Sequence, residues 1–165
     1  MCEVTGIEIN EMQAKKAAFK IDNVVVGDVE TLDPGFLTGQ FDYIVLADVL
    51  EHLRDPLSVL RKYLKYLSSC GKVIISIPNV RHVSVLCEVV LKGEWKYRSF
   101  GIMDEGHLRF FTYKSFMRLL KESGLEVVDM KRIFSLKGSK LFNFLSFGLL
   151  RDFLTAQYIF LLRKR

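Results

Sequence analysis

The sequence has little of what marks disulfide-bonded or secreted proteins. Its 165 residues include only three cysteines, at positions 2, 70 and 87, and no C-x-x-C pair. This spacing predicts neither a disulfide framework nor a cysteine-based zinc site, so no bound metal is expected. The N-terminus carries no secretory signal. Reduced thiols are typical of the cytoplasm, where we expect this protein to act.

Several functional classes lack their motifs. Residues 141–162 are apolar but interrupted by Arg151 and Asp152, and each half is shorter than the roughly 20 residues of a membrane-spanning helix. There is no G-x-S-x-G nucleophile elbow and no phosphate-binding P-loop. The basic C-terminal end has no aromatic platform on which bases could stack, so no nucleic-acid partner is expected.

The composition is that of a globular protein with an uneven distribution of charge. Half of the residues are hydrophobic and the net charge is +5, which allows a sizeable core in one domain of residues 1–165. From Lys131 onward the only acidic residue is Asp152. Such a basic end is usually a solvated face. An amphipathic helix over residues 138–153 with basic flanks would also leave contact with a membrane surface open.

Short β-rich runs alternate with helical spacing along the chain. Strands are predicted at residues 4–9, 23–29, 41–47, 72–77, 125–134 and 157–162, and helices at 10–20, 56–67, 83–91, 112–123 and 138–153. This alternation predicts an α/β fold: a three-layer αβα sandwich with a Rossmann-like, mostly parallel sheet and an antiparallel pair at the C-terminal edge. Residues 93–111 mix aromatic, charged and glycine residues, which favours a loop that covers a site.

Polar residues follow four of the predicted strands. Glu8 comes after the first, Asp28 after the second, Asp48 after the third and Asn79 after the fourth. The third strand, residues 41–47, has no polar alternation beyond Asp42 and is predicted to be buried on both faces. In such sheets ligands bind at the carboxyl ends of the strands, where an acid can accept hydrogen bonds from ribose hydroxyls.

Five segments together resemble the class I S-adenosylmethionine-dependent methyltransferases. They read GIEIN (6–10), GDVE (27–30), FDYIVLADVLEHLRDP (41–56), GKVIISIPN (71–79) and GIMDEGHLRFFT (101–112). The resemblance covers nearly the whole chain, and the last segment is similar to small methyltransferases linked with glycan and cell-surface polysaccharide synthesis. It implies S-adenosylmethionine as cofactor and a small-molecule or glycan acceptor.

The resemblance also implies which residues face the cofactor. Glu8, with Ile9 beside it, would bind the ribose hydroxyls. Asp28 and Val29 would frame the adenine. The methionine part would lie beside Ala47 and Asp48.

A second group of residues would face the acceptor. The resemblance places His52 near the transferred methyl group, and histidine is the natural general base for a hydroxyl near neutral pH. His107 is the other candidate base. The remaining residues expected to contact the acceptor are Asn79, Tyr97, Arg98 and Arg109.

One element of the family pattern is missing. The glycine-rich loop normally precedes the ribose acid by about 20 residues, but Glu8 has only seven residues before it. We therefore interpret the chain as an N-terminally truncated methyltransferase whose cofactor affinity is low or absent. The alternative is a non-catalytic domain of the same fold that serves assembly or regulation. A partner chain could fill the gap in the sheet, so a homodimer stays open.

Overall fold

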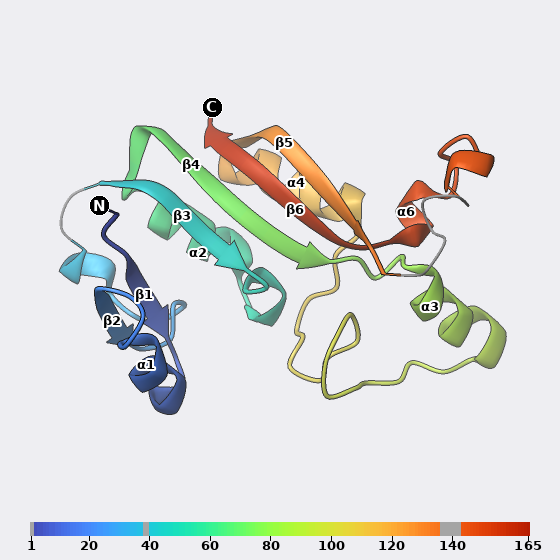
Figure 1. Ribbon diagram of the computed structural model, residues 1–165, viewed down its shortest axis with the longest axis horizontal. Helices are drawn as coiled ribbons and strands as arrows, with labels where there is room; N and C mark the ends of the chain where they lie inside the picture. The colour runs from blue at the N-terminus through green and yellow to red at the C-terminus, as the bar shows by residue number, and fades with distance from the viewer. Residues whose placement is uncertain (1, 38–39, 136–142) are drawn as a thin grey trace. The chain divides into compact units, whose positions relative to one another are not determined.

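The computed structural model describes residues 2–37, 40–135 and 143–165 (Figure 1). The chain forms two compact units, Met1–Gly39 and Gln40–Arg165, and each is described by itself. Whether they act as one domain stays a prediction. Strands and helices alternate along the chain, with parallel and antiparallel strand pairs, which confirms the predicted α/β class.

The first unit holds a two-stranded parallel sheet and one helix. Strand β1 (Thr5–Glu8) pairs with β2 (Asn23–Val26), and α1 (Glu11–Ala17) connects them. Asn10 begins α1 as predicted, because its Oδ1 accepts hydrogen bonds from the backbone N–H groups of Met12 and Gln13. A short 3₁₀ helix, η1 (Pro34–Phe36), follows.

The second unit is built on a four-stranded mixed sheet. Its strands are β3 (Phe41–Ala47), β4 (Leu67–Pro78), β5 (Leu125–Phe134) and β6 (Thr155–Lys164), in the order β3-β4-β6-β5. The β3–β4 pair is parallel, whereas β6 is antiparallel to both β4 and β5. The predicted antiparallel pair formed by the last two strands is therefore confirmed.

Two helices supply the core on one face of this sheet. Figure 1 shows α2 (Pro56–Leu64) and α4 (Tyr113–Ser123) on the same side of the strands. Phe116 of α4 contacts Phe160 of β6, with ring centroids 5.0 Å apart. Leu60 and Leu120 are almost fully buried beside them. Thr112 caps α4, and Gly124 ends it at φ 81°, a left-handed conformation that glycine adopts without strain.

Short helical segments connect the remaining elements. The 3₁₀ helix η2 (Leu50–His52) follows β3, and α3 (Val83–Leu86) continues into the π-helical turn η3 (Cys87–Leu91). The last helix is α6 (Arg151–Leu154).

Two details of the predicted sheet are wrong. In β3, Tyr43 and Val45 are more than half exposed. They were expected to be buried, but they lie on an uncovered face of β3, whereas Ile44 and Leu46 on its other face are half-buried. Strand β4 begins at Leu67, which was assigned to the preceding helix, because Leu67 pairs with Phe41 of β3. Because of that pairing, the strand also includes residues 68–71, which were expected to end the helix.

The predicted amphipathic helix over residues 138–153 is only partly confirmed where the structure describes it, because residues 143–145 and 151–153 are helical but the segment between them is not. Residues 136–142 lie outside the described part. Residues 146–150 form turns, with Phe147 at φ 51° and Gly148 at φ 79°, and α6 has four residues. Two consecutive positive φ angles cannot belong to a right-handed helix. In the described part of the chain, no helix is long and apolar enough to cross a membrane.

Candidate functional site

Asp48 lies directly after β3, where the strand ends. Its φ is 52°, a conformation that is uncommon outside glycine and tends to occur at functional positions. The Asp48 N–H donates to Oγ of Ser76, while its Oδ1 accepts from Ser76 Oγ at 2.8 Å and from Gln157 Nε2 at 2.7 Å. These bonds hold the carboxylate at the carboxyl ends of β3 and β4.

Glu51 lies three residues further on, in η2, and is the buried acidic residue of the described part of the chain. Its side chain is 1% exposed, and neither carboxylate oxygen has a hydrogen-bond partner. Its backbone carbonyl accepts from the N–H groups of Leu108 and Arg109. Buried polar groups are nearly always paired, so an unpaired buried carboxylate calls for an explanation.

Two histidines flank this carboxylate. Nδ1 of His52 lies 2.9 Å from the Gly106 carbonyl oxygen, and Nδ1 of His107 lies 3.1 Å from that of Ile102. A carbonyl only accepts, so both Nδ1 atoms carry the proton. In the neutral state, each Nε2 therefore keeps a free lone pair.

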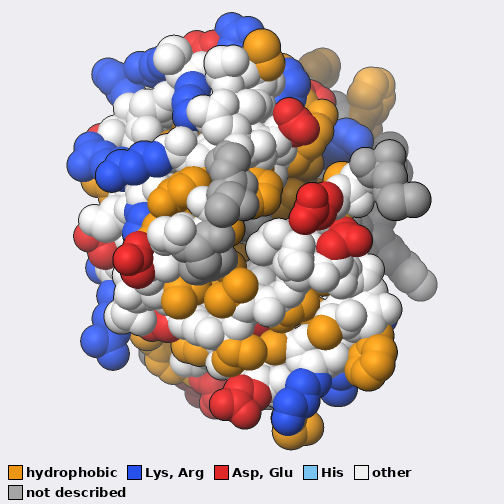
Figure 2. Space-filling view, turned by 90° about the vertical axis from the view of Figure 1, so that its left-hand side faces the viewer, with side chains coloured by type: hydrophobic (Ala, Val, Ile, Leu, Met, Phe, Trp, Pro, Cys, Tyr) orange, Lys and Arg blue, Asp and Glu red, His pale blue; other side chains and the backbone are white. Residues whose placement is uncertain are grey.

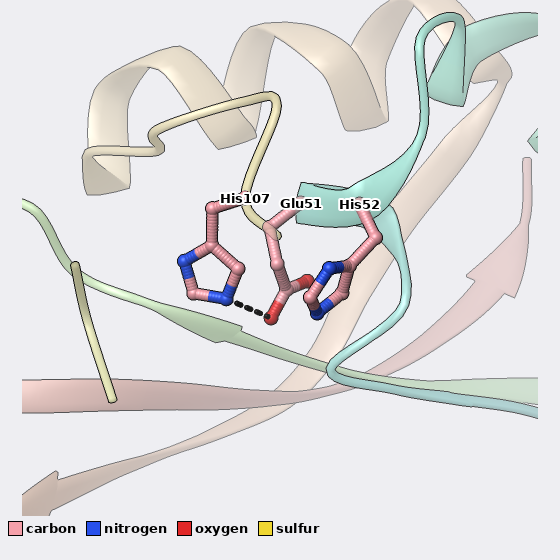
Figure 3. Close-up of side chains that lie close together, drawn as sticks. All are labelled: Glu51, His52 and His107. Carbon is pink, nitrogen blue, oxygen red and sulfur yellow. Dashed lines mark ion pairs between the residues drawn. The ribbon is translucent and has the colours of Figure 1, made fainter. Parts of the chain in front are cut away.

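The three side chains converge from two distant segments. Figure 3 shows the Glu51 carboxylate between the two imidazole rings. The closest approach joins Nε2 of His107 to Oε1 of Glu51 at 4.0 Å, and the ring centroids of His52 and His107 are 4.7 Å apart. Gly106 permits this arrangement, because a Cβ there would lie 3.3 Å from Nδ1 of His52.

Burial shifts the protonation of this cluster. Loss of hydration raises the pKa of Glu51 from 4.5 to about 7, and the nearby Asp48 charge adds to the rise while the backbone amide of Glu51 opposes it. Burial also lowers the pKa of His107. Near neutral pH, the cluster can take up a proton, and its three side chains offer ligand atoms for a cation.

The residues predicted to bind the cofactor's ribose and adenine lie in the first unit, at the ends of its two strands. Oε1 of Glu8 accepts from the Asn10 N–H at 2.8 Å, and Oδ1 of Asp28 accepts from the Glu30 N–H at 2.8 Å. Ile9 is 68% exposed, and Val29 is half-buried. Ala47, predicted to face the methionine part, is the exposed last residue of β3 in the second unit.

The residues predicted to face the acceptor fall into two groups, those bonded within the fold and one with an exposed ring. The Asn79 side chain is fully buried, and its Nδ2 donates to the carbonyls of Asp152 and Thr155. Arg98 pairs with Glu88, and Arg109 donates to the Arg54 carbonyl. These three side chains are engaged within the fold. Only Tyr97 presents a half-exposed ring, which lies against Phe110.

Two buried polar residues, Glu51 and His82, were not among the predicted site residues. Glu51 stands beside His52 in the sequence, and nothing in the spacing indicates its full burial. His82 is 2% exposed. Its ring accepts from the Ser84 N–H and meets the Ser135 hydroxyl, which makes it a buried cap of α3.

Comparison with known protein families matches residues 1–130 to the methyltransferase domain. Two curated relatives are ubiquinone biosynthesis O-methyltransferases. That of Aeromonas salmonicida is 29% identical over 94 residues, covering 57% of this chain and 39% of the relative. That of Ruegeria pomeroyi is 34% identical over 92 residues, covering 56% of this chain and 37% of the relative. The chain thus matches less than half the length of these relatives.

Solved structures share the fold. A protein of Thermotoga maritima, described as an S-adenosylmethionine-dependent methyltransferase and possible histamine N-methyltransferase, superposes with a TM-score of 0.66. The comparison covers 98% of this chain and 72% of the other, at 17% sequence identity. At that identity, the likeness establishes the fold alone.

Proposed function

This chain belongs to the methyltransferase domain family, and from that premise we propose that it binds S-adenosylmethionine and transfers the methyl group to an oxygen of a small-molecule or glycan acceptor. The observation that carries the proposal is the family match over residues 1–130, which includes the strand-end acids Glu8, Asp28 and Asp48. The oxygen acceptor follows the two O-methyltransferase relatives.

The cofactor residues divide by the part of the molecule they would contact. Glu8 would accept hydrogen bonds from the ribose hydroxyls, with Ile9 beside it, and Asp28 and Val29 would frame the adenine. Asp48 is suited to the ammonium end of the methionine part, because Ser76 and Gln157 already orient its carboxylate. A side chain that is already held in position loses less conformational entropy on binding, so the ligand binds more tightly.

The reaction needs an acceptor oxygen aligned with the sulfonium methyl. The oxygen–methyl bond forms as the sulfur–methyl bond breaks, S-adenosylhomocysteine leaves, and the hydroxyl proton must be removed. Orientation alone can supply up to roughly 7–11 kcal/mol of the barrier in well-aligned cases. The cluster of Glu51, His52 and His107 is the group we assign to the acceptor oxygen, because it combines free imidazole lone pairs with a buried carboxylate.

Calorimetry with S-adenosylmethionine and S-adenosylhomocysteine tests the proposal. Glu8→Gln removes the charge of the ribose acceptor, so we expect binding of both ligands to weaken about 10–100-fold, the effect of losing charged hydrogen bonds worth roughly 1.5–3 kcal/mol. Glu11→Gln is the matched control, because it removes an exposed charge from the first turn of α1. If neither ligand binds the wild-type chain at millimolar concentration, the non-catalytic alternative replaces this proposal.

A further inference from the structure

We propose that Glu51, His52 and His107 form a binding site for one divalent transition-metal cation, with Zn²⁺ as the ion best suited to it. The inference deepens the proposed function: its catalytic meaning rests on methyl transfer to oxygen, but cation binding can be measured separately. The sequence alone does not predict a metal site here, because His107 is separated from His52 by 54 intervening residues.

The first argument is the unpaired carboxylate. Both oxygens of Glu51 are buried without a hydrogen-bond partner, although the side chain is 1% exposed. A charged group in such a place is normally paired or bound to a metal. The groups that face it are its own backbone N–H, the two imidazole rings and Asp48, which Ser76 and Gln157 engage. A cation would supply the missing partner.

The second argument is the orientation of the histidines. Both direct Nδ1 at a backbone carbonyl, Gly106 for His52 and Ile102 for His107. Metal-binding histidines characteristically donate their other ring N–H to a carbonyl or carboxylate, which fixes the tautomer and the ring. Here it leaves an Nε2 lone pair on each ring for a ligand.

The third argument is distance. One possible ligand atom from each of the three residues lies within 4.8 Å of the others. The His107 Nε2 to Glu51 Oε1 distance of 4.0 Å is long for a hydrogen bond. Tetrahedral zinc bonds of about 2.0–2.1 Å place ligand atoms roughly 3.3–3.4 Å apart. The three side chains are therefore close enough to share one ion after both histidines and Glu51 draw together by about 1 Å.

The ligand set indicates the ion and its role. Two imidazoles and one carboxylate suit Zn²⁺, Fe²⁺ and similar cations, whereas Mg²⁺ prefers oxygen ligands. Three protein ligands leave an open position, which is typical of catalytic rather than structural zinc sites. An acceptor hydroxyl bound there would lose its proton to water more readily, and its oxygen would then attack the methyl group.

The test is Zn²⁺ binding to the chelator-stripped full-length chain, measured by competition with a chromophoric chelator. We expect one Zn²⁺ per chain in the wild type and at least about tenfold weaker binding in Glu51→Gln, His52→Asn and His107→Asn. Asparagine can keep the Nδ1-type bond to the carbonyl while it removes Nε2. Glu105→Gln is the control, because it removes an exposed neighbouring charge. Circular dichroism checks that each variant folds.

Two further readouts make the result decisive. Co²⁺ at this site should show visible bands without a thiolate charge-transfer band, because none of the three ligands is a cysteine. Binding at the free, exposed Cys2, Cys70 or Cys87 would instead produce that band. Excess Mg²⁺ should not displace Zn²⁺. No stoichiometric Zn²⁺ binding, or equal binding by the three cluster variants and the wild type, would overturn the inference. Binding of S-adenosylhomocysteine to metal-free protein is scored separately, so either proposal can fail while the other stands.

Discussion

The two compact units differ most in how much they bury. In Met1–Gly39, Ala14 and Pro34 are the buried residues among those whose burial is described, while large apolar side chains such as Ile9, Met12 and Phe19 are exposed. Apolar groups are visible at the surface in the space-filling view (Figure 2). Gln40–Arg165 instead has a continuous core around Phe116, Phe160 and the inward face of β4.

This difference separates two kinds of functional residue. The cluster of Glu51, His52 and His107 belongs to the unit with the core, where the Glu51 carboxylate is buried without a hydrogen-bond partner. Glu8 and Asp28 belong to the unit built on a two-stranded sheet, and such a sheet is marginally stable by itself. A packed core can hold an unpaired buried carboxylate in place. Acids at the strand ends of a small sheet are stabilised more by a ligand that binds them.

The largest expected effect is in hydrogen exchange. Amides in the β4–β6 ladder should exchange at least about a thousandfold more slowly than those in the β1–β2 ladder, because core strands open only with global unfolding. Amide exchange followed by mass spectrometry measures both in one sample. Equal protection in the two ladders would mean that the units unfold together, and the comparison would fail.

The next largest effect is expected when a core side chain is truncated, which should lower the free energy of unfolding. Phe160→Ala removes a fully buried ring that packs on Phe116, so we expect about 3–5 kcal/mol less stability in urea unfolding. The matched change in the first unit is Val24→Ala, which affects a half-buried side chain of β2. It should leave the main transition nearly unchanged.

Glu51 should make the stability of the second unit depend on pH. Its folded pKa of about 7 exceeds the ordinary 4.5, so its contribution is fully present below pH 4.5 and is lost as pH rises through 7. Glu51→Gln removes this term and should be more stable than the wild type by up to about 3 kcal/mol at pH 8.

Urea unfolding of both proteins at pH 5 and pH 8, with a chelator present, measures this effect. The lowered pKa of His107 acts in the opposite direction, since it costs stability as pH falls below 6.5. Both proteins carry His107, so its effect largely cancels in the difference. A stability gap between the two that does not widen with pH would contradict the assigned burial of the Glu51 charge.

The smallest expected effect compares two helix caps. Asn10 caps α1 and Thr112 caps α4, each by accepting backbone hydrogen bonds. Removing such a cap costs typically about 1 kcal/mol. Thr112→Ala should therefore lower the urea midpoint of the main transition, whereas Asn10→Ala should raise exchange only in α1, β1 and β2. A shift of the main transition by Asn10→Ala would show that the two units are energetically coupled.

Local signals predicted much of the fold. Strand β5 was expected at residues 125–134 and lies there, because Gly124 ends the preceding helix through its own backbone freedom. The caps Asn10, Asp55 and Thr112 are residue types that favour helix N-termini, and each capping bond spans only two or three residues. Interactions between residues so close in the chain can be predicted from the sequence itself.

Predictions that depended on distant partners fared worse. The exposure of Tyr43 and Val45 follows from the uncovered face of β3 on which they lie, and Leu67 became a strand residue by pairing with Phe41. The turn at Phe147 and Gly148 broke the expected amphipathic helix, although the apolar periodicity favoured it. In each case the local structure depends on strand pairing or on packing against distant residues, which a short window of sequence does not reveal.

The sequence by itself determined the order of strands and helices, the helix caps and the acids at the strand ends, because these depend on neighbouring residues and on hydrophobic period. Only the tertiary structure decided that the Glu51 carboxylate would be buried without a hydrogen-bond partner and that Nε2 of His107 would lie 4.0 Å from its Oε1. The physical reason is that burial and convergence depend on how β3, η2 and the loop before α4 pack together, and no spacing along the chain encodes that distance.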